Sequence, residues 1–548
     1  MAVTGKDHIS YFRVFRLNGF LVATFGVALC VALPLCVVLS FLATTSSDVW
    51  QHLVDTLLLR YISNTLLLSF YVTIGVVCIG VPTAWVIAFY RFPGRQTLSW
   101  LLLLPMAYPA YILAYTYTGV LEYAGPVLTW MRASDMPDWV MSPFLNIRSL
   151  LGAALMLSLV LYPYVYLLAR AAFLQQSANL MEAGYTLGQS RLSVFRRVVI
   201  PMARPAIAAG ALLAIMETVA DFGTVQFFGV QTFTTGIIRT YYGFGDTPGA
   251  AQLSSVLLGF VAILVILERH SRNRIRYYSD QMRRLDQAAQ HLTGFSAFAA
   301  QVLCALPILF GFLIPTTLLV NWTIFDAQLQ SLWQLAWNSF ALAGGSSFLI
   351  VGVALLIAYA NRLFPTRSLS YMTTFIGLGY ALPGVVVAIG ILIPFGIFDA
   401  WISELLTSWA VKPQLWLSGT LFAVIFAYLV RFLAVANGNV FSGLSRIRPS
   451  IDQSGRLLGL SQTGVLTRIH IPLMQGSVLT AILVCFVDIL KELPATLILR
   501  PFDFNTLAVR AYELAGQERL LDASPASLCI VLVGLVPVIL LNRSIGKL

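Results

Sequence analysis

The chain has 548 residues, of which 58% are hydrophobic and 10% are charged, and its formal net charge is +11. A mean hydropathy of +0.82 is far above what the core of a soluble protein of this length needs, so a water-soluble globular protein is excluded. The basic residues follow the loops of a membrane topology, and this distribution excludes nucleic-acid binding as the reason for the charge.

Apolar stretches of about 20 residues or more recur along the chain, and this length crosses a hydrocarbon layer roughly 30 Å thick. The first stretch is too long for the core of a signal peptide and lacks a cleavage site, so we interpret it as a retained span. The twelve predicted spans are 17–43, 64–90, 97–121, 149–174, 203–228, 251–268, 297–321, 336–360, 369–398, 417–441, 474–499 and 525–542. The fold class is therefore predicted to be an all-α integral membrane protein.

The charge distribution predicts the orientation. With the amino terminus inside, the basic residues concentrate in the cytoplasmic segments, including the loops 91–98 and 361–368, while the external loops are rich in acids. Both termini are therefore expected in the cytoplasm. The polar stretch 269–292 is interpreted as a cytoplasmic linker between a first module at 1–268 and a second at 293–548. Six spans per module predict two parallel repeats about an axis along the membrane normal.

One motif occurs twice, at 182–201 and at 453–472, each time just before a predicted span. Each copy is expected to form two short helices that meet at a glycine, because glycine adopts turn conformations at little steric cost. A proline then begins the next span, where its missing N–H is tolerated. The corresponding residues are Glu182, Ala183, Gly184, Gly188 and Pro201 in the first copy, and Gln453, Ser454, Gly455, Gly459 and Pro472 in the second.

This doubled pattern resembles the EAA loop of the membrane subunits of ATP-binding-cassette importers. The chain thus resembles two fused importer permeases of the MetI-like type I fold. The resemblance implies that two copies of a cytoplasmic ATPase subunit dock on the two loops and that a periplasmic solute-binding protein docks on the opposite face. It also implies a multi-pass protein of the bacterial inner membrane.

The chain contains no G-x4-G-K-[ST] sequence, so it lacks a P-loop for nucleotide phosphates. We therefore expect no cofactor on this chain and no enzymatic activity of its own, with ATP and Mg²⁺ bound by the partner ATPase. In the second copy, Gln453 stands where the motif has an acid, and Asp452 lies one residue earlier. The two coupling loops are therefore expected to be unequal, with Glu182 contributing more than Gln453.

Acidic residues also occur inside two predicted spans. Glu217 and Asp221 are four residues apart, as are Asp488 and Glu492, so each pair is expected to share a helix face. Ionisable groups in a bilayer are costly and indicate a translocation path or a specific partner. One interpretation is structural, as a gate or as ion pairs with Lys491, Arg239 or Arg510; the other is transient contact with a cationic cargo such as iron. On the second interpretation, Asp221 and Glu492 are expected to show the cleaner transport defect.

No His or Cys spacing indicates a firm metal site. Six tyrosines in predicted spans are expected mainly as packing aromatics, although their phenolic oxygens are alternative ligands. They are Tyr108, Tyr111, Tyr115, Tyr162, Tyr164 and Tyr166.

The stretches 220–224 and 228–236, and the stretches 491–497 and 499–501, resemble the equivalent segments of fused ferric-iron importer permeases. The resemblance implies ferric iron as the cargo, although thiamine and phosphonate importers use similar fused permeases. An ion-coupled secondary transporter that uses the four acids as a relay is the alternative from another class. A membrane-embedded enzyme finds no support, since the sequence shows no nucleophile and base arrangement.

Overall fold

The computed structural model describes residues 19–44, 48–174, 186–273, 290–325, 332–407 and 415–545, and these residues are almost entirely helical. Within them, ten helical segments are long and apolar enough to cross a membrane. Two bent helix pairs raise the number to twelve if each pair forms one span, in agreement with the predicted all-α membrane fold. The ten are α1 (Gly19–Ser40), α3 (Leu58–Phe89), α8 (Leu150–Leu174), α11 (Ile200–Ala220), α14 (Thr247–Asn273), α15 and α16 together (Gly294–Ile308 and Ile314–Phe325), α17 (Leu332–Leu363), α19 (Gly384–Thr407), α20 (Leu421–Ser445) and α27 (Leu520–Ile545).

The bent pairs turn by 89° and 81°. The first joins α4 (Arg95–Leu101) and η2 (Leu104–Ala107) to α5 (Ala110–Leu121) and α6 (Pro126–Ala133); the second joins α22 (Gln462–Val465), η8 (Leu466–His470) and α23 (Ile471–Leu473) to α24 (Gln475–Leu490). The remaining elements are α2 (Asp48–Thr56), α7 (Asp138–Leu145), α10 (Arg191–Val194), α12 (Gly223–Phe227), α13 (Phe233–Ile238), α18 (Arg367–Ile376), α21 (Pro449–Leu457), α25 (Pro494–Leu499), α26 (Leu507–Gly516), the short η1 (Phe41–Ala43), η3 (Phe195–Val199), η4 (Arg239–Gly243), η6 (Leu309–Leu313) and η7 (Gly379–Ala381), and the two-residue strands β1 (Tyr90–Arg91) and β2 (Gln290–His291), which pair in parallel.

Two predicted spans, 97–121 and 369–398, are wrong as continuous helices. Pro109 is in an extended conformation just before α5, and Pro383 directly precedes α19. Proline lacks an N–H and disfavours helix in the residue before it, so the chain breaks at both points. The long helix of the second segment therefore starts at Gly384 rather than near residue 369.

The duplication is visible in the helix lengths. Helices α3 and α17 both have 32 residues, and α8 and α20 both have 25. Within the first half, α3 and α11 pack closely on α8 through glycines: a Cβ added to Gly80 would lie 3.0 Å from the Tyr162 carbonyl oxygen, and one added to Gly210 would lie 2.8 Å from the Val165 Cα. Small residues at helix contacts allow this approach in membrane proteins.

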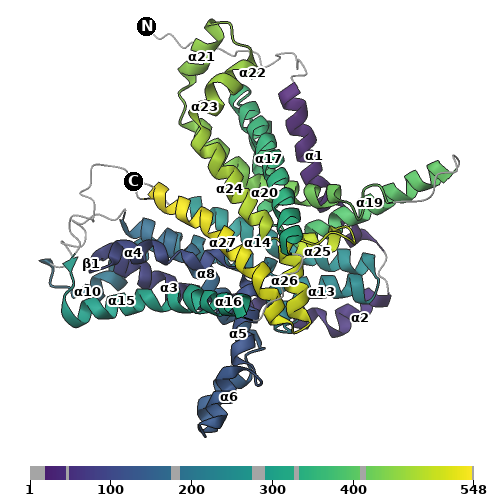
Figure 1. Cartoon of the computed structure of the whole chain (residues 1–548). Coiled ribbons are helices and arrows are strands. Elements are labelled where there is room, and N and C mark those ends of the chain that lie inside the picture. The colour runs from purple at the N-terminus through teal and green to yellow at the C-terminus, as the bar shows by residue number, and fades with distance from the viewer. Residues whose placement is uncertain are drawn as a thin grey trace.

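The first helix of each half packs on the other half. Helix α1 packs against α17 and α19, and a Cβ on Gly390 of α19 would lie 2.5 Å from the Pro34 carbonyl oxygen of α1. In return, α15, η6 and α16 pack along α3, α4 and α5, where the hydroxyls of Tyr108 and Thr316 are 2.8 Å apart. Figure 1 shows α15 beside α3, and α1 beside α17. Each half therefore contributes its first helix to the packing of the other half.

Candidate functional site: an acidic cavity and two glycine elbows

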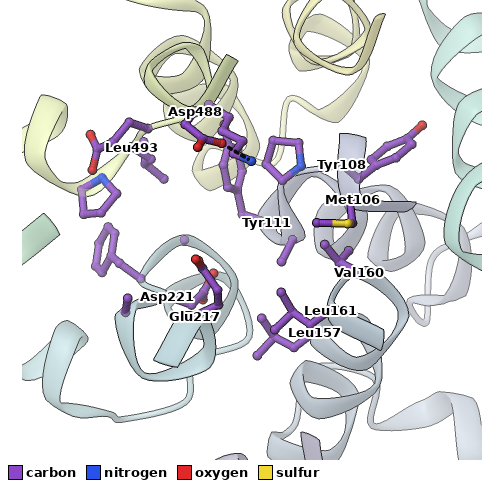
Figure 2. A pocket seen from close by; sticks show the side chains of 18 of the residues that line it. Met106, Tyr108, Tyr111, Leu157, Val160, Leu161, Glu217, Asp221, Asp488 and Leu493 are labelled. Carbon is purple, nitrogen blue, oxygen red and sulfur yellow. Dashed lines mark ion pairs between the residues drawn. The ribbon is translucent and has the colours of Figure 1, made fainter. Parts of the chain in front are cut away.

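A cavity of about 150 Å³ lies between the two halves and brings together all four acids predicted from the sequence. Figure 2 shows Glu217, Asp221 and Asp488 around it, with Tyr111 and Leu157 from the neighbouring helices. The polar and charged residues that line the cavity are Tyr108, Tyr111, Tyr164, Glu217, Asp221, Tyr380, Arg431, Asp488, Lys491 and Glu492. The cavity thus holds four carboxylates, four phenols and two basic side chains.

Asp221 and Glu492 cap short helices rather than continue long ones. Helix α11 ends at Ala220, and Asp221 turns into an extended conformation, with Oδ1 accepting from the N–H groups of Thr224 and Val225 at 3.0 and 3.1 Å. Glu492 follows the end of α24 and accepts from the N–H groups of Ala495 and Thr496, both at 3.1 Å. The carboxylates therefore satisfy donors at the starts of α12 and α25, and a negative charge is favourable there.

The predicted spans 203–228 and 474–499 and the shared helix faces are corrected by this geometry. Glu217 and Asp488 remain on α11 and α24, whereas Asp221 and Glu492 lie beyond the helix ends. A carboxylate that bonds the amides three and four residues ahead competes with the continuing helix, so the backbone turns at that point. The acids still meet, because the turn brings each one back to the same cavity.

Glu217 and Asp488 have different partners. Glu217 Oε1 accepts a hydrogen bond from the Tyr380 hydroxyl at 2.7 Å, which is a contact between the halves. Asp488 forms an ion pair with Lys491, three residues later, at 2.8 Å, the pairing that the spacing predicts.

Arg431 is a site residue that the sequence reasoning missed. Its Nη1 lies 2.7 Å from Oε1 of Glu492, and the two side chains are 13% and 1% exposed. Arg431 is the one charged residue in the predicted span 417–441, and a lone arginine in an apolar span is a signal that could have identified it.

Arg239 and Arg510 do not pair with the cavity acids, so this part of the prediction is wrong. Arg239 lines a second cavity of about 430 Å³ and lies over the ring of Phe244. Arg510 Nη1 is instead 3.9 Å from Glu513 Oε2 on its own helix, α26.

The two arginines are also not structural equivalents. Asn64 donates to the Gln231 carbonyl in the first half, and Asn338 donates to the Asn505 carbonyl in the second. These matching bonds make Gln231 the counterpart of Asn505. The separation of these two residues along the chain differs from the separation of the two copies of the doubled motif. The register therefore shifts between the capping acids and this region, and the shift separates the two arginines.

The six tyrosines divide into two groups. Tyr108, Tyr111 and Tyr164 line the cavity. Tyr115, Tyr162 and Tyr166 instead bond to Ser527, to the Leu102 carbonyl and to the Ser99 carbonyl, as packing aromatics do. Tyr111 is only 6% exposed, and its hydroxyl has no hydrogen-bond partner among the described residues, so it is available to a group that enters the cavity.

In the described part of the chain, no three His, Cys, Asp or Glu residues lie close enough together to hold a metal ion.

The two EAA segments form elbows. In the first motif the structure describes the elbow from residue 186 onward, and in the second motif it describes all of 453–472. Gly188 and Gly459 have φ angles of +77° and +83°, the left-handed conformation that glycine adopts readily. Each elbow continues through a π-helical turn, η3 and η8, into a segment with Pro201 or Pro472 in its first turn. Glu182, Ala183 and Gly184 lie outside the described residues, as does most of the interpreted linker 269–292.

The second elbow is anchored by a network around Asp452. Asp452 Oδ2 is 2.6 Å from Arg362 Nε at the end of α17, and its Oδ1 is 2.8 Å from Nε2 of the fully buried His470. Burial opposes ionisation, but the hydrogen bonds and charges of Arg362 and His470 outweigh it and hold the pKa of Asp452 below its usual range. Gln453 is exposed, so the acid that anchors this elbow is Asp452.

Both elbows expose leucines near the glycine turn. Leu187 is 79% exposed, and Leu457 and Leu458 are 88% and 84% exposed. Apolar side chains this exposed at a turn outside the spans form a surface that suits a partner protein.

The comparisons agree with these features. The family described as "Binding-protein-dependent transport system inner membrane component" matches residues 77–277. The "Fe(3+)-transport system permease protein FbpB 2" of Haemophilus influenzae is 26% identical over 94% of this chain and 96% of its own length. The "Sulfate transport system permease protein CysT" of Escherichia coli is 27% identical over 44% of this chain and 86% of its own length. The "Putative 2-aminoethylphosphonate transport system permease protein PhnU" of Salmonella choleraesuis is 28% identical over 35% of this chain and 68% of its own.

The match extends along nearly the full length of a ferric transport permease, and the apolar helices agree with a location in the membrane. Proteins of this family are transport subunits that work with an ATPase and a substrate-binding protein. The chain is therefore a multi-pass membrane protein that resembles the inner-membrane permeases of the ATP-binding-cassette importers, the ferric transport permeases among them.

Proposed function

We propose that this permease carries ferric iron from a periplasmic binding protein into the cytoplasm, through the cavity between its halves. The supporting observation is the charge of that cavity: four carboxylates face two basic side chains. Like charges repel strongly where water is scarce, so such a cavity favours a multivalent cation over the anions named for the sulfate and phosphonate relatives. The full-length relative named for Fe(3+) transport supports the same cargo.

The proposal includes the coupling machinery. Two copies of an ATPase subunit dock on the elbows around Gly188 and Gly459, and both termini lie in the cytoplasm with them. ATP and Mg²⁺ are held by the ATPase, and this chain binds no cofactor. Closure of the ATPase pair moves the elbows and shifts the halves between outward-open and inward-open states.

The test is transport by the purified permease with its ATPase and binding protein in proteoliposomes. We expect ferric iron to be taken up and to stimulate ATP hydrolysis, whereas sulfate, 2-aminoethylphosphonate and thiamine give neither. ATP-dependent uptake of one of the other three solutes without iron uptake would replace iron with that solute. Iron uptake that an ion gradient drives without the ATPase would instead establish the ion-coupled transporter.

A further inference from the structure

The two halves of the cavity carry the same acids but different bases. Helices α8 and α20 have the same length, and their first and last residues are separated along the chain by the same distance as the two copies of the doubled motif. In this alignment Arg431 of α20 occupies the place of Val160 of α8. Lys491 directly precedes the capping Glu492, as Ala220 directly precedes the capping Asp221. Val160 and Ala220 also line the cavity, so all four positions face the same space.

The acids of the second half are therefore neutralised locally. Glu492 pairs with Arg431 and Asp488 pairs with Lys491, each at 2.7 or 2.8 Å. In the described part of the chain, Glu217 and Asp221 have only hydroxyl and amide partners and form no ion pair. The excess negative charge of the cavity belongs to the first half.

This asymmetry has a physical consequence for the cavity between transport cycles. Four buried carboxylates without counter-charges would draw in protons or monovalent cations, because an uncompensated buried charge is very costly. Two bases attached to the wall balance two of the acids permanently. The remaining two formal charges lie on one wall, where a single multivalent cation neutralises more of them than a single monovalent cation does.

We propose that Arg431 and Lys491 are tethered counter-ions that determine the charge selectivity of the cavity: they neutralise the second half and leave Glu217 and Asp221 as the wall that a multivalent cation meets. This proposal rests on the proposed function only in assigning the cargo to this cavity. The Arg431 Nε has no hydrogen-bond partner among the described residues, so this guanidinium retains a free donor toward its surroundings.

The pseudo-symmetry supplies the test. R431V with K491A gives the second half the residues of the first half, and in proteoliposomes without ATP we expect a K⁺ leak that rises roughly tenfold or more over wild type. Conversely, A220K adds a base beside Asp221 without removing any ion pair. Its ATP-driven iron uptake should fall roughly tenfold or more below that of A220M, which adds similar bulk without charge.

The two readouts keep the two proposals separable. Absence of iron uptake by wild type overturns the proposed cargo, while the K⁺ leak of the double variant still tests the counter-ions. If R431V with K491A does not assemble, the comparison of A220K with A220M tests the counter-ion proposal in its place. Both the K⁺ leak and the ATP-driven iron uptake of these two variants are then measured. Equal uptake by A220K and A220M, or a double variant that assembles and stays as tight to K⁺ as wild type, overturns the counter-ion proposal.

Discussion

Asp221 and Glu492 make the same contact in the two halves, because each carboxylate accepts hydrogen bonds from the amides three and four residues ahead of it. The nearby hydroxyls of Thr224 and Thr496 add bonds of 2.9 and 2.8 Å. These caps break the long helices and turn the chain back into the cavity, so the acids shape the path as well as charging it.

Removal of a cap should reduce stability. We expect Asp221→Ala and Glu492→Ala each to lower the free energy of unfolding by about 1–2 kcal/mol, the range measured for lost helix caps. For Glu492 the loss should be larger, because Arg431 would be left without its partner. Thermal unfolding of the purified permease in detergent measures both. Unchanged melting temperatures would show that the caps carry no stability.

Glu217 should separate transport from stability. Glu217→Gln keeps an oxygen that accepts from the Tyr380 hydroxyl, so the melting temperature should stay close to that of wild type. Iron uptake should nevertheless fall by about tenfold or more, because one of the two unpaired charges is lost. Tyr380→Phe is the complementary control, since it removes this hydrogen bond, which Glu217→Gln retains, and keeps the charge. Wild-type uptake by Glu217→Gln would contradict a role for the charge.

The glycine turns offer a test of coupling. A Cβ added to Gly188 or Gly459 would meet no atom within 4 Å, so a substitution is disfavoured by the backbone conformation alone. Gly459→Ala should cost about 1 kcal/mol and Gly459→Val more, because a β-branched residue is least tolerated at positive φ. Co-purification of the ATPase and iron uptake should decline in the same order. Full assembly and wild-type uptake by both Gly188→Val and Gly459→Val would contradict a coupling role for the turns.

The Asp452 network predicts a pH dependence. The folded state holds the pKa of Asp452 below its usual range, so its contribution is complete above the unfolded pKa of about 3.9 and is lost as pH falls through the folded value. Asp452→Asn should loosen the second elbow by about 1.5–3 kcal/mol at neutral pH and remove this part of the acid dependence. Hydrogen exchange of the elbow amides at pH 7, and again as the pH falls below about 3.9, measures both effects. An elbow equally protected in the variant would rule out this anchor.

The two elbows should contribute unequally to uptake. Glu182→Ala is expected to reduce ATP-driven iron uptake more than Gln453→Ala, because the second copy lacks an acid at the aligned position. Gln453 is exposed, so its truncation leaves the Asp452 network in place. Uptake by the two variants at equal surface expression gives the ranking, and the reverse order would contradict it.

Features that depend on local composition were predictable from the sequence alone. The apolar stretches determine the membrane class, since a span needs only length and hydropathy. The doubled motif indicated the family, and Gly188 and Gly459 were identified because a left-handed turn favours one residue type. The four cavity acids were found because charges in apolar spans stand out.

Only the tertiary structure decided how these parts meet. Helical periodicity gave no sign that Asp221 and Glu492 lie beyond the helix ends, since a cap competes with the helix through hydrogen bonds that composition does not reveal. Arg431 reaches Glu492 across 61 residues, and helices α1 and α15 exchange partners between the halves. Such contacts depend on packing between segments distant in sequence, and a single sequence records neither their distance nor their register: the shift that separates Arg239 from Arg510 became visible only through two matching asparagine hydrogen bonds.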